Sequence, residues 1–206
     1  KKYLKKTTDN NKHNIITIGR SESDLQILQI DNLWRHTALR LRVNNQEIDI
    51  KIPLIGEFQI HNALIAAATV TVDKHIGIIE SLKTLETLKG VKGRLEFIGS
   101  NKYDAGIYVD YAHTPDALEF VLREMRKYTA KKLYLVFGAG GNRDIGKRYL
   151  MGQVAENFSD VIIVTDDNPR NEDPLKIRLD ILMSTKNAIE IGNRYAAIKT
   201  AIDQLE

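Results

Sequence analysis

Three short segments of the chain combine carboxylates, cations and glycines in patterns suited to binding a charged small molecule. Residues 110–115 read D-Y-A-H-T-P, residues 138–148 read G-A-G-G-N-R-D-I-G-K-R, and residues 165–174 read T-D-D-N-P-R-N-E-D-P. Each segment follows a short apolar run, so we expect each to be the loop after a buried strand. Ligands of open parallel sheets bind beyond the carboxyl ends of the strands. The three loops are therefore the predicted functional site.

The first loop offers a carboxylate and an imidazole just before a predicted helix. Asp110 is suited to accept hydrogen bonds from ribose hydroxyls, and His113 to contact a base or a phosphate. The alternative is structural: Asp110 bonds nearby backbone amides and His113 is a surface histidine. Both interpretations stay open from these residues alone.

The second loop places glycines and cations ahead of another predicted helix, where free N–H groups and the helix dipole favour anions. The dinucleotide-binding fingerprint fails because its third glycine falls on Arg143. The phosphate loop of nucleotide triphosphatases fails because the Lys147-Arg148 pair lacks a following Ser or Thr. The alternative is a glycine-rich turn with a solvated basic face.

The third loop combines an Asp pair, an Asn amide, a Pro and an Arg within residues 166–170. Paired carboxylates are suited to Mg²⁺, and the planar fork of Arg170 matches a carboxylate, with the preceding proline making its presentation rigid. The alternative is a turn whose Asp173 caps a helix beginning at Pro174, and that cap is expected in either case.

The elements that position these loops fall into two parts. The fold class we expect is α/β, with a C-terminal Rossmann-like parallel sheet covered by helices on both faces, because strands and helices alternate along the second part. Its expected strands are residues 107–111, 133–137, 161–165 and 188–191, and its expected helices are residues 115–127, 147–158, 174–183 and 194–206.

The N-terminal part has a different pattern. Strands are expected at residues 14–19 and 25–30, then a hairpin of residues 39–43 and 48–52 around Asn44-Asn45, then helices at residues 61–73 and 78–88. Residues 89–94 hold two glycines and three cations, a composition typical of an interdomain hinge. The predicted domains are therefore residues 1–91 and 92–206.

Composition narrows the class of protein. The 206 residues include no cysteine and carry a formal net charge of +3, which excludes disulfides, thiolate metal sites and a catalytic thiol. We expect a cytoplasmic protein. The longest apolar run, residues 63–72, is too short to cross a membrane. Without a dense basic stripe interleaved with aromatic residues, no nucleic-acid binding is expected.

Five motifs in order resemble the Mur ligase family, which uses ATP to build the peptide stem of bacterial cell-wall precursors. Residues 56–64, G-E-F-Q-I-H-N-A-L, are similar to the family's G-x-F-N-x-x-N-x-L segment, and residues 93–96, G-R-L-E, to its G-R-M-E linker. The three loops are similar to D-Y-A-H-T-P, G-x-G-G-x-R-D-x-G-K-R and T-x-D-N-P-R. Gln59 departs from the pattern, which has Asn there. The resemblance covers nearly all of the chain.

The resemblance implies that residues 1–91 are the last part of a central ATPase domain and residues 92–206 a truncated C-terminal domain that binds an amino acid. It also implies a monomer. The positions that match those around the adenine and ribose of ATP are Asn62, Arg94, Asp110 and His113.

The D-N-P-R form is typical of the family members that add meso-diaminopimelate to UDP-N-acetylmuramoyl-L-alanyl-D-glutamate. The resemblance implies that the residues binding this amino acid are Arg143, Asp167, Asn168, Pro169 and Arg170. Arg170 would pair with the carboxylate that distinguishes diaminopimelate from lysine.

Other parts of the family's machinery are expected outside this chain. The UDP-binding domain, the phosphate loop, the Mg²⁺ ligands and a carbamylated lysine are expected upstream of Lys1, and a G-K-G-H-E loop beyond Glu206. We therefore expect no catalytic residue and no metal ligand within the chain, and no ligase activity from it alone. Two further hypotheses remain open: a nicotinamide-dependent oxidoreductase with a degenerate glycine loop, and a noncatalytic binding domain.

Overall fold

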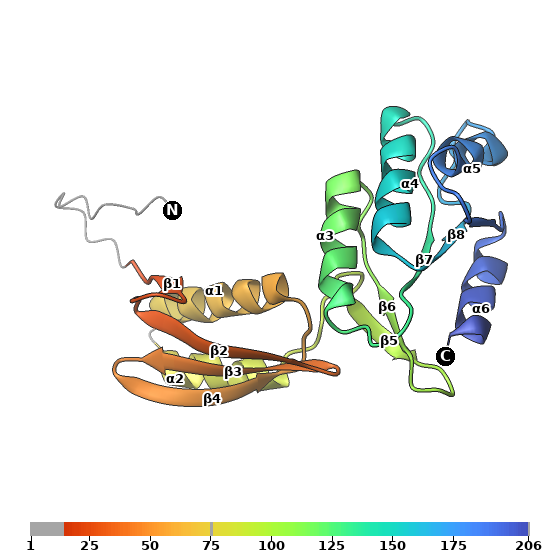
Figure 1. Ribbon diagram of the computed structural model, residues 1–206. Coiled ribbons are helices and arrows are strands. Elements are labelled where there is room, and N and C mark those ends of the chain that lie inside the picture. The colour runs from red at the N-terminus through yellow and green to blue at the C-terminus, as the bar shows by residue number, and fades with distance from the viewer. Residues whose placement is uncertain (1–14, 75, 206) are drawn as a thin grey trace.

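The protein, described by a computed structural model, consists of two groups of elements that lie side by side (Figure 1). The structure describes residues 15–74 and 76–205, so part of the strand expected at residues 14–19 lies outside the described residues. The N-terminal half comprises β1 (Ile18–Gly19), β2 (Leu25–Leu33), β3 (His36–Val43), β4 (Gln46–Ile52), α1 (Glu57–Lys74), α2 (Ile78–Thr84) and the short 3₁₀ helix η1 (Leu85–Thr87).

The first sheet has the strand order β1-β2-β3-β4. The predicted hairpin is confirmed: β3 and β4 pair antiparallel, with Val43 opposite Gln46. Asn44 and Asn45 have φ values of 50° and 63°, the left-handed conformation that a two-residue hairpin turn requires and that Asn adopts at low cost. The two helices begin and end near their predicted bounds, except that α1 starts four residues early at Glu57 and the second helix finishes as η1.

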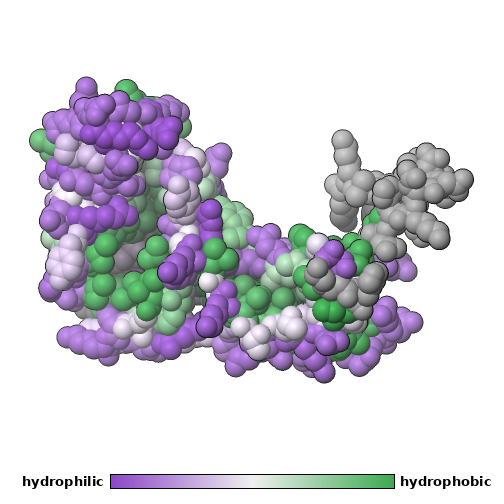
Figure 2. Space-filling view, turned by 180° about the vertical axis from the view of Figure 1, so that it is seen from behind, coloured by the Kyte–Doolittle hydropathy of each residue, from purple (hydrophilic) through white to green (hydrophobic). Residues whose placement is uncertain are grey.

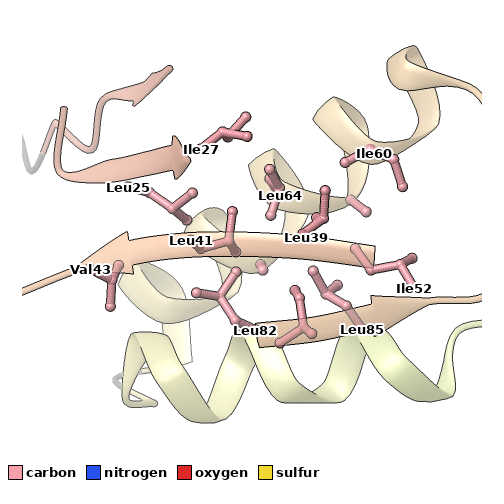
Figure 3. Packing of buried hydrophobic residues seen from close by; sticks show 13 residues of the cluster. Leu25, Ile27, Leu39, Leu41, Val43, Ile52, Ile60, Leu64, Leu82 and Leu85 are labelled. Carbon is pink, nitrogen blue, oxygen red and sulfur yellow. The ribbon is translucent and has the colours of Figure 1, made fainter. Parts of the chain in front are cut away.

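Alternating side chains of this sheet build the core of the N-terminal half. Leu39, Leu41 and Val43 are buried, while the intervening arginines are exposed. Figure 3 shows the strand side chains and those of the two helices, among them Leu64 and Leu82, pointing toward one another. Each such side chain contributes roughly 1.5–3 kcal/mol on burial. The hydrophobic face of the sheet therefore fixes where α1 and α2 lie.

The C-terminal half is built from shorter strands and more helices. Its elements are β5 (Glu96–Ser100), β6 (Gly106–Val109), α3 (Pro115–Arg126), β7 (Tyr134–Phe137), α4 (Gly146–Phe158), β8 (Val161–Val164), α5 (Pro174–Leu182), β9 (Ile189–Glu190) and α6 (Arg194–Gln204).

The predicted parallel sheet with helices on both faces is confirmed. Strands β7, β8 and β9 pair parallel in that order. Helices α3, α4 and α5 share one core cluster with these strands, whereas α6 packs through Ala197 and Ala201 on Ile163 from the other face. Two predicted caps are confirmed, since the Thr114 side chain accepts from the Ala117 amide and the Asp173 side chain from the Leu175 amide.

One strand assignment was incomplete. The strand expected at residues 107–111 is β6, but it pairs antiparallel with β5 in a separate two-stranded sheet. β5 was not predicted, because its segment E-F-I-G-S has a glycine and too short an apolar pattern to indicate a strand. The turn between the two strands is closed by Asn101, whose side-chain oxygen accepts from the Tyr103 and Ala105 amides at 2.9 and 3.1 Å.

Besides the linker, described residues of the two halves contact each other around the β2–β3 turn and around the start of α1, where Phe58 meets Phe120 of α3. The β2–β3 turn lies against the β5–β6 hairpin, where Arg35 pairs with Asp104 at 2.8 Å and the Trp34 ring meets the Tyr108 ring edge-on. The Tyr128 hydroxyl accepts from the Gly56 amide at 2.9 Å. Movement about residues 89–94 stays a prediction, and any such movement would have to break these contacts.

The far side of the molecule carries both polar and apolar surface. Figure 2 shows green hydrophobic side chains between hydrophilic rims on the C-terminal half. Large exposed apolar side chains in this half include Ile98 and Val109. None of the helices in the described part of the chain is long and apolar enough to span a membrane.

Candidate functional site: three loops at the carboxyl ends of the strands

The three predicted loops follow β6, β7 and β8 and are joined to one another. The Lys147 ammonium donates to the His113 carbonyl at 3.1 Å, which ties the second loop to the first. The Gly141 amide donates to the Asn168 carbonyl at 2.9 Å, which ties the second loop to the third. The structure thus brings the segments into one continuous surface at the strand ends.

The glycines of the second loop are explained by the third loop that packs on them. A Cβ atom added to Gly141 would lie 1.9 Å from the Pro169 carbonyl oxygen, and one added to Gly138 would lie 2.2 Å from that of Thr165. At Gly140 it would lie 2.9 Å from the Arg170 guanidinium. Side chains at these positions would push the two loops apart. The close approach of the third loop therefore supplies a packing reason for these glycines.

Arg170 is held in a defined geometry within the third loop. Its φ of 50° is the left-handed conformation, uncommon for a residue other than glycine. The side-chain oxygen of Asn168 accepts from the Arg170 amide at 3.3 Å, and the guanidinium donates to the Gly141 carbonyl at 2.6 Å. That single hydrogen bond leaves other N–H groups of the exposed guanidinium for a ligand. Strain of this kind persists where surrounding contacts over-determine it, and it is frequent in ligand sites.

Around Arg170, the other predicted residues of this loop have different surroundings. Asp167 and Asn168 are exposed, and the Asp167 carboxylate accepts from the Asn168 amide at 2.7 Å. The Pro169 carbonyl accepts from the Glu172 amide at 3.0 Å. Arg143, in the second loop, is exposed and makes no ion pair with any described residue. Its guanidinium is therefore available to a ligand carboxylate.

Arg148 corrects one sequence-based interpretation. The alternative for the second loop was a solvated basic face, but the Arg148 side chain is 0% exposed. It donates two hydrogen bonds to the Glu172 carboxylate, at 2.9 and 2.8 Å, and one to Asp180 at 2.9 Å. Burial lowers the pKa of Arg148, but these hydrogen bonds raise the pKa by a larger amount, so the net shift is upward. Arg148 is thus a buried charge that joins α4, the third loop and α5.

Glu172 extends that ion pair into the second loop. Its carboxylate accepts from the Asn142 amide, and this hydrogen bond, with Arg148, holds the pKa of Glu172 below its usual value of 4.5. The Asn142 side chain in turn accepts from the Asn171 amide at 3.0 Å. The second and third loops are therefore connected through side chains as well as backbone.

The Asp pair predicted to suit Mg²⁺ does not fit a metal site. Asp166 pairs with Arg178, which also pairs with Glu190 at 2.5 Å. Within residues 15–74 and 76–205, no cluster of three or more His, Asp or Glu side chains is arranged to hold a metal ion. Instead, the Asp166 carboxylate pairs with Arg178, and the Asp167 carboxylate accepts from the Asn168 amide.

Two of the four predicted nucleotide-contacting residues, Arg94 and His113, lie against Tyr111 at the start of the C-terminal half. The Arg94 guanidinium lies 5.0 Å from the centre of the Tyr111 ring. The centres of the His113 and Tyr111 rings are 5.1 Å apart, and the two rings meet edge to face. Tyr111 itself is 64% exposed. The three exposed side chains combine an aromatic ring, an imidazole and a guanidinium, groups that can contact a nucleotide base.

Asp110 holds the linker in place beneath this surface. One carboxylate oxygen accepts from the Leu95 amide and the other from the Ala112 amide, both at 2.8 Å. This is the structural alternative stated for Asp110, although each oxygen retains a lone pair for a further donor. The nitrogen of the Gln59 side chain donates to the Arg94 carbonyl at 2.9 Å. Asn62 lies one turn further along α1 and is exposed.

Several residues at this site were missed from the sequence. Tyr111 stands between two assigned positions in D-Y-A-H-T-P, and the sequence does not show that its ring contacts both Arg94 and His113. Gln59 was treated as a departure, yet it is buried and anchors the linker. Glu172 lies two residues beyond the Arg of the third loop, and its partner Arg148 is 24 residues away. The sequence contains no periodic signal for a pair of that kind.

Comparison with known families supports the resemblance. Residues 93–206 match the model described as the Mur ligase glutamate ligase domain. Residues 1–70 match the Mur ligase middle domain. The first of these covers more than half of the chain.

Several curated relatives share one name. Proteins named UDP-N-acetylmuramoyl-L-alanyl-D-glutamate--2,6-diaminopimelate ligase include that of Caulobacter vibrioides, 50% identical over 188 residues, which are 91% of this chain and 38% of the relative. The protein from Rhizobium meliloti is 42% identical over 94% of this chain and 40% of its own length. The chain thus spans about two fifths of the length of the relatives it matches.

Solved structures agree with this assignment. A structure of a UDP-N-acetylmuramoyl-L-alanyl-D-glutamate--2,6-diaminopimelate ligase has a TM-score of 0.70 and 32% identity, over 93% of this chain and 40% of that one. Folylpolyglutamate synthase from Thermotoga maritima has a TM-score of 0.70 at 22% identity, over 86% of this chain and 41% of that one, which shows a shared fold. With its two matching regions, its motifs and its fold, the chain belongs to the Mur ligase family.

Proposed function

We propose that this chain is part of an ATP-dependent ligase that adds meso-diaminopimelate to UDP-N-acetylmuramoyl-L-alanyl-D-glutamate. ATP would phosphorylate the γ-carboxylate of the glutamyl residue, and the diaminopimelate amine would attack the acyl phosphate and release phosphate. The proposal extends to a cytoplasmic monomer acting on small molecules. The names of the relatives support the reaction, and the geometry of the strand-end loops supports the amino acid.

The geometry of Arg170 is the observation that carries the choice of amino acid. Diaminopimelate differs from lysine by one carboxylate, so selectivity requires a group that pairs with it. Arg170 is held by Asn168 and by the Gly141 carbonyl, yet its guanidinium remains exposed. Arg143, on the adjacent loop, supplies a second exposed guanidinium for another carboxylate of the same substrate. A planar fork recognises a carboxylate through two parallel hydrogen bonds.

The exposed surface around Tyr111 is the proposed place for the nucleotide. Arg94 and His113 lie against the Tyr111 ring, Asp110 retains acceptor capacity for a ribose hydroxyl, and Asn62 lies one helical turn beyond Gln59, which contacts the linker. We propose that these residues close on the adenine and ribose of ATP. They would bind and orient the nucleotide without taking part in phosphoryl transfer.

Mg²⁺ would supply charge neutralisation to such a reaction. The described acidic residues do not fit a site for it, because Asp166 is committed to Arg178 and no suitable cluster occurs among them. We therefore assign no step to a metal held by this chain, and its ligands are proposed to lie in other parts of the full-length enzyme.

The test is an assay of the full-length protein and of the 206-residue chain. With ATP, Mg²⁺ and UDP-N-acetylmuramoyl-L-alanyl-D-glutamate, the full-length protein should release ADP when meso-diaminopimelate is added, and much more slowly with lysine. The isolated chain should release none. Equal rates with lysine would refute the proposed amino acid, and ADP release by the isolated chain would refute the proposed division of roles.

A further inference from the structure

The buried ion pair between Arg148 and Glu172 is not explained by ligand binding, because neither residue is among those proposed to touch a substrate. Arg148 is 0% exposed and places both N–H groups of one guanidinium nitrogen on the Glu172 carboxylate. Removing one partner of a buried ion pair leaves an uncompensated charge, so the position of Glu172 is tied to that of Arg148. The position of Glu172 shows what this one does.

Glu172 lies between the two loops that present the cationic residues. Its carboxylate accepts from the Asn142 amide, next to Arg143 in the second loop. Its own amide donates to the Pro169 carbonyl at 3.0 Å, next to Arg170 in the third loop. Arg143 therefore follows the residue whose amide donates to Glu172, and Arg170 follows the residue whose carbonyl accepts from Glu172.

We propose that Glu172, held by Arg148, is a positioning residue that fixes the spacing of Arg143 and Arg170, and thereby the selection of an amino acid with two carboxylate groups to be bound. The inference rests on the proposed function. Asn142 and Arg170 both have a φ of 50°, so the loops adopt conformations that need external support. Two guanidiniums on separately moving loops would bind the two carboxylates of one substrate less tightly than two guanidiniums held at a fixed spacing.

Asp180 provides a matched control for this role. It is the other carboxylate that pairs with Arg148, at 2.9 Å, and its side chain has the same 24% exposure as that of Glu172. Asp180 belongs to α5, however, and hydrogen-bonds neither loop. Substituting either carboxylate removes one charged partner of Arg148, but only Glu172 is connected to the loops.

The decisive experiment compares Glu172→Gln with Asp180→Asn in the full-length enzyme. Glu172→Gln should raise the KM for meso-diaminopimelate about tenfold and leave the KM for ATP within about twofold. Asp180→Asn should leave both within about twofold, although both variants lower the melting temperature. Equal increases in the diaminopimelate KM for the two variants, or no increase for either, would overturn the proposal.

A second variant keeps the test valid if Glu172→Gln does not fold. Asn142→Gly retains the left-handed backbone but removes the side-chain oxygen that accepts from the Asn171 amide. It should raise the diaminopimelate KM in the same direction, with the ATP KM again unchanged. An unchanged diaminopimelate KM in this variant would contradict coupling between the loops.

A measurement independent of activity separates this proposal from the proposed function. In the 206-residue chain, hydrogen exchange at the amides of Asn142 and Asn171 should be at least about tenfold faster in Glu172→Gln than in Asp180→Asn. Equal exchange rates would overturn the positioning role. A wild-type enzyme that ligates no diaminopimelate would overturn the proposed function instead, and the exchange result would still decide whether Glu172 couples the loops.

Discussion

The two ends of the candidate site are built differently. Around Arg143 and Arg170, two loops interlock through glycine contacts, a buried arginine and side-chain hydrogen bonds. Around Tyr111, the side chains are exposed and contact one another, and the linker is held mainly by Asp110 and Gln59. The proposed amino-acid end is thus held by contacts within the chain, whereas the proposed nucleotide end lies on the segment that joins the two halves.

This difference has a functional consequence. A preformed pair of guanidiniums discriminates between amino acids because it cannot adapt to a missing carboxylate. The predicted movement about residues 89–94 would change the surface beside the linker, which would suit the proposed nucleotide, because it must bind, react and leave. Substitutions at the two ends should therefore have different effects on stability and on kinetics.

The largest effect is expected where the two loops touch. In Gly141→Ala, the new Cβ atom would lie 1.9 Å from the Pro169 carbonyl oxygen, and backbone cannot move aside cheaply. We expect the free energy of unfolding to fall by about 3 kcal/mol, at the upper end of the usual overpacking cost. Urea denaturation of the 206-residue chain measures it.

Gly99→Ala is the control for this substitution. Gly99 lies in the β5 strand, and a Cβ atom there would meet nothing within 4 Å. Its free energy of unfolding should change by about 0.5 kcal/mol or less. Similar losses for both variants would mean that the loops at the amino-acid end are not interlocked as described.

The next largest effect concerns Arg170. In the full-length enzyme, Arg170→Ala should lower kcat/KM for meso-diaminopimelate by more than about thirtyfold, because removing one partner of a desolvated charge pair costs roughly 2–5 kcal/mol. Lysine lacks the partner carboxylate, so its kcat/KM should fall little or rise slightly. Steady-state rates with both amino acids provide the measurement. Equal losses for the two substrates would make Arg170 a structural residue.

A smaller effect is expected at the nucleotide end. Arg94→Ala removes the cation from the face of the Tyr111 ring, a contact worth about 0.5–1 kcal/mol at exposed sites. The KM for ATP should therefore rise about two- to fivefold, with the KM for diaminopimelate and the melting temperature almost unchanged. Initial rates at varied ATP concentration test this. An unchanged ATP KM and unchanged turnover would remove Arg94 from the nucleotide site.

The sequence predicted the positions of these loops better than their internal structure. Apolar runs followed by Gly, Asp and Pro locate strand ends, because both strand periodicity and turn chemistry are local signals. The caps at Thr114 and Asp173 are local for the same reason, and both are confirmed. Side-chain partners across 24 residues, such as Arg148 and Glu172, depend on tertiary packing. No local pattern distinguishes a buried arginine from an exposed one in G-K-R.

The missed β5 strand illustrates the same limit. Residues Glu96 to Ser100 pair antiparallel with β6, and the register shifts between Phe97 and Gly99. A glycine and an interrupted ladder remove the strict alternation by which an exposed strand is recognised. The ring contacts of Phe97 with Trp34 and Tyr108 complete this hairpin, and they come from segments far apart in the sequence. Which side chains meet across the two halves could not be predicted.

The smallest expected effect is a pH dependence at the amino-acid end. The Asn142 amide and Arg148 hold the pKa of Glu172 below its usual 4.5 in the folded protein. A carboxyl with a lowered folded pKa stabilises the protein above its unfolded pKa, and that stability is lost as the pH falls through the folded value. The difference in melting temperature between wild type and Glu172→Gln should therefore be full at neutral pH and shrink progressively below about pH 4.5. Other carboxylates, such as that of Asp160 beside Arg126, also have lowered pKa values and make the wild-type melting temperature depend on pH. The quantity to measure is therefore the difference in melting temperature between wild type and Glu172→Gln. A difference that stays constant down to pH 3 would show that the charge of Glu172 does not hold the two loops together.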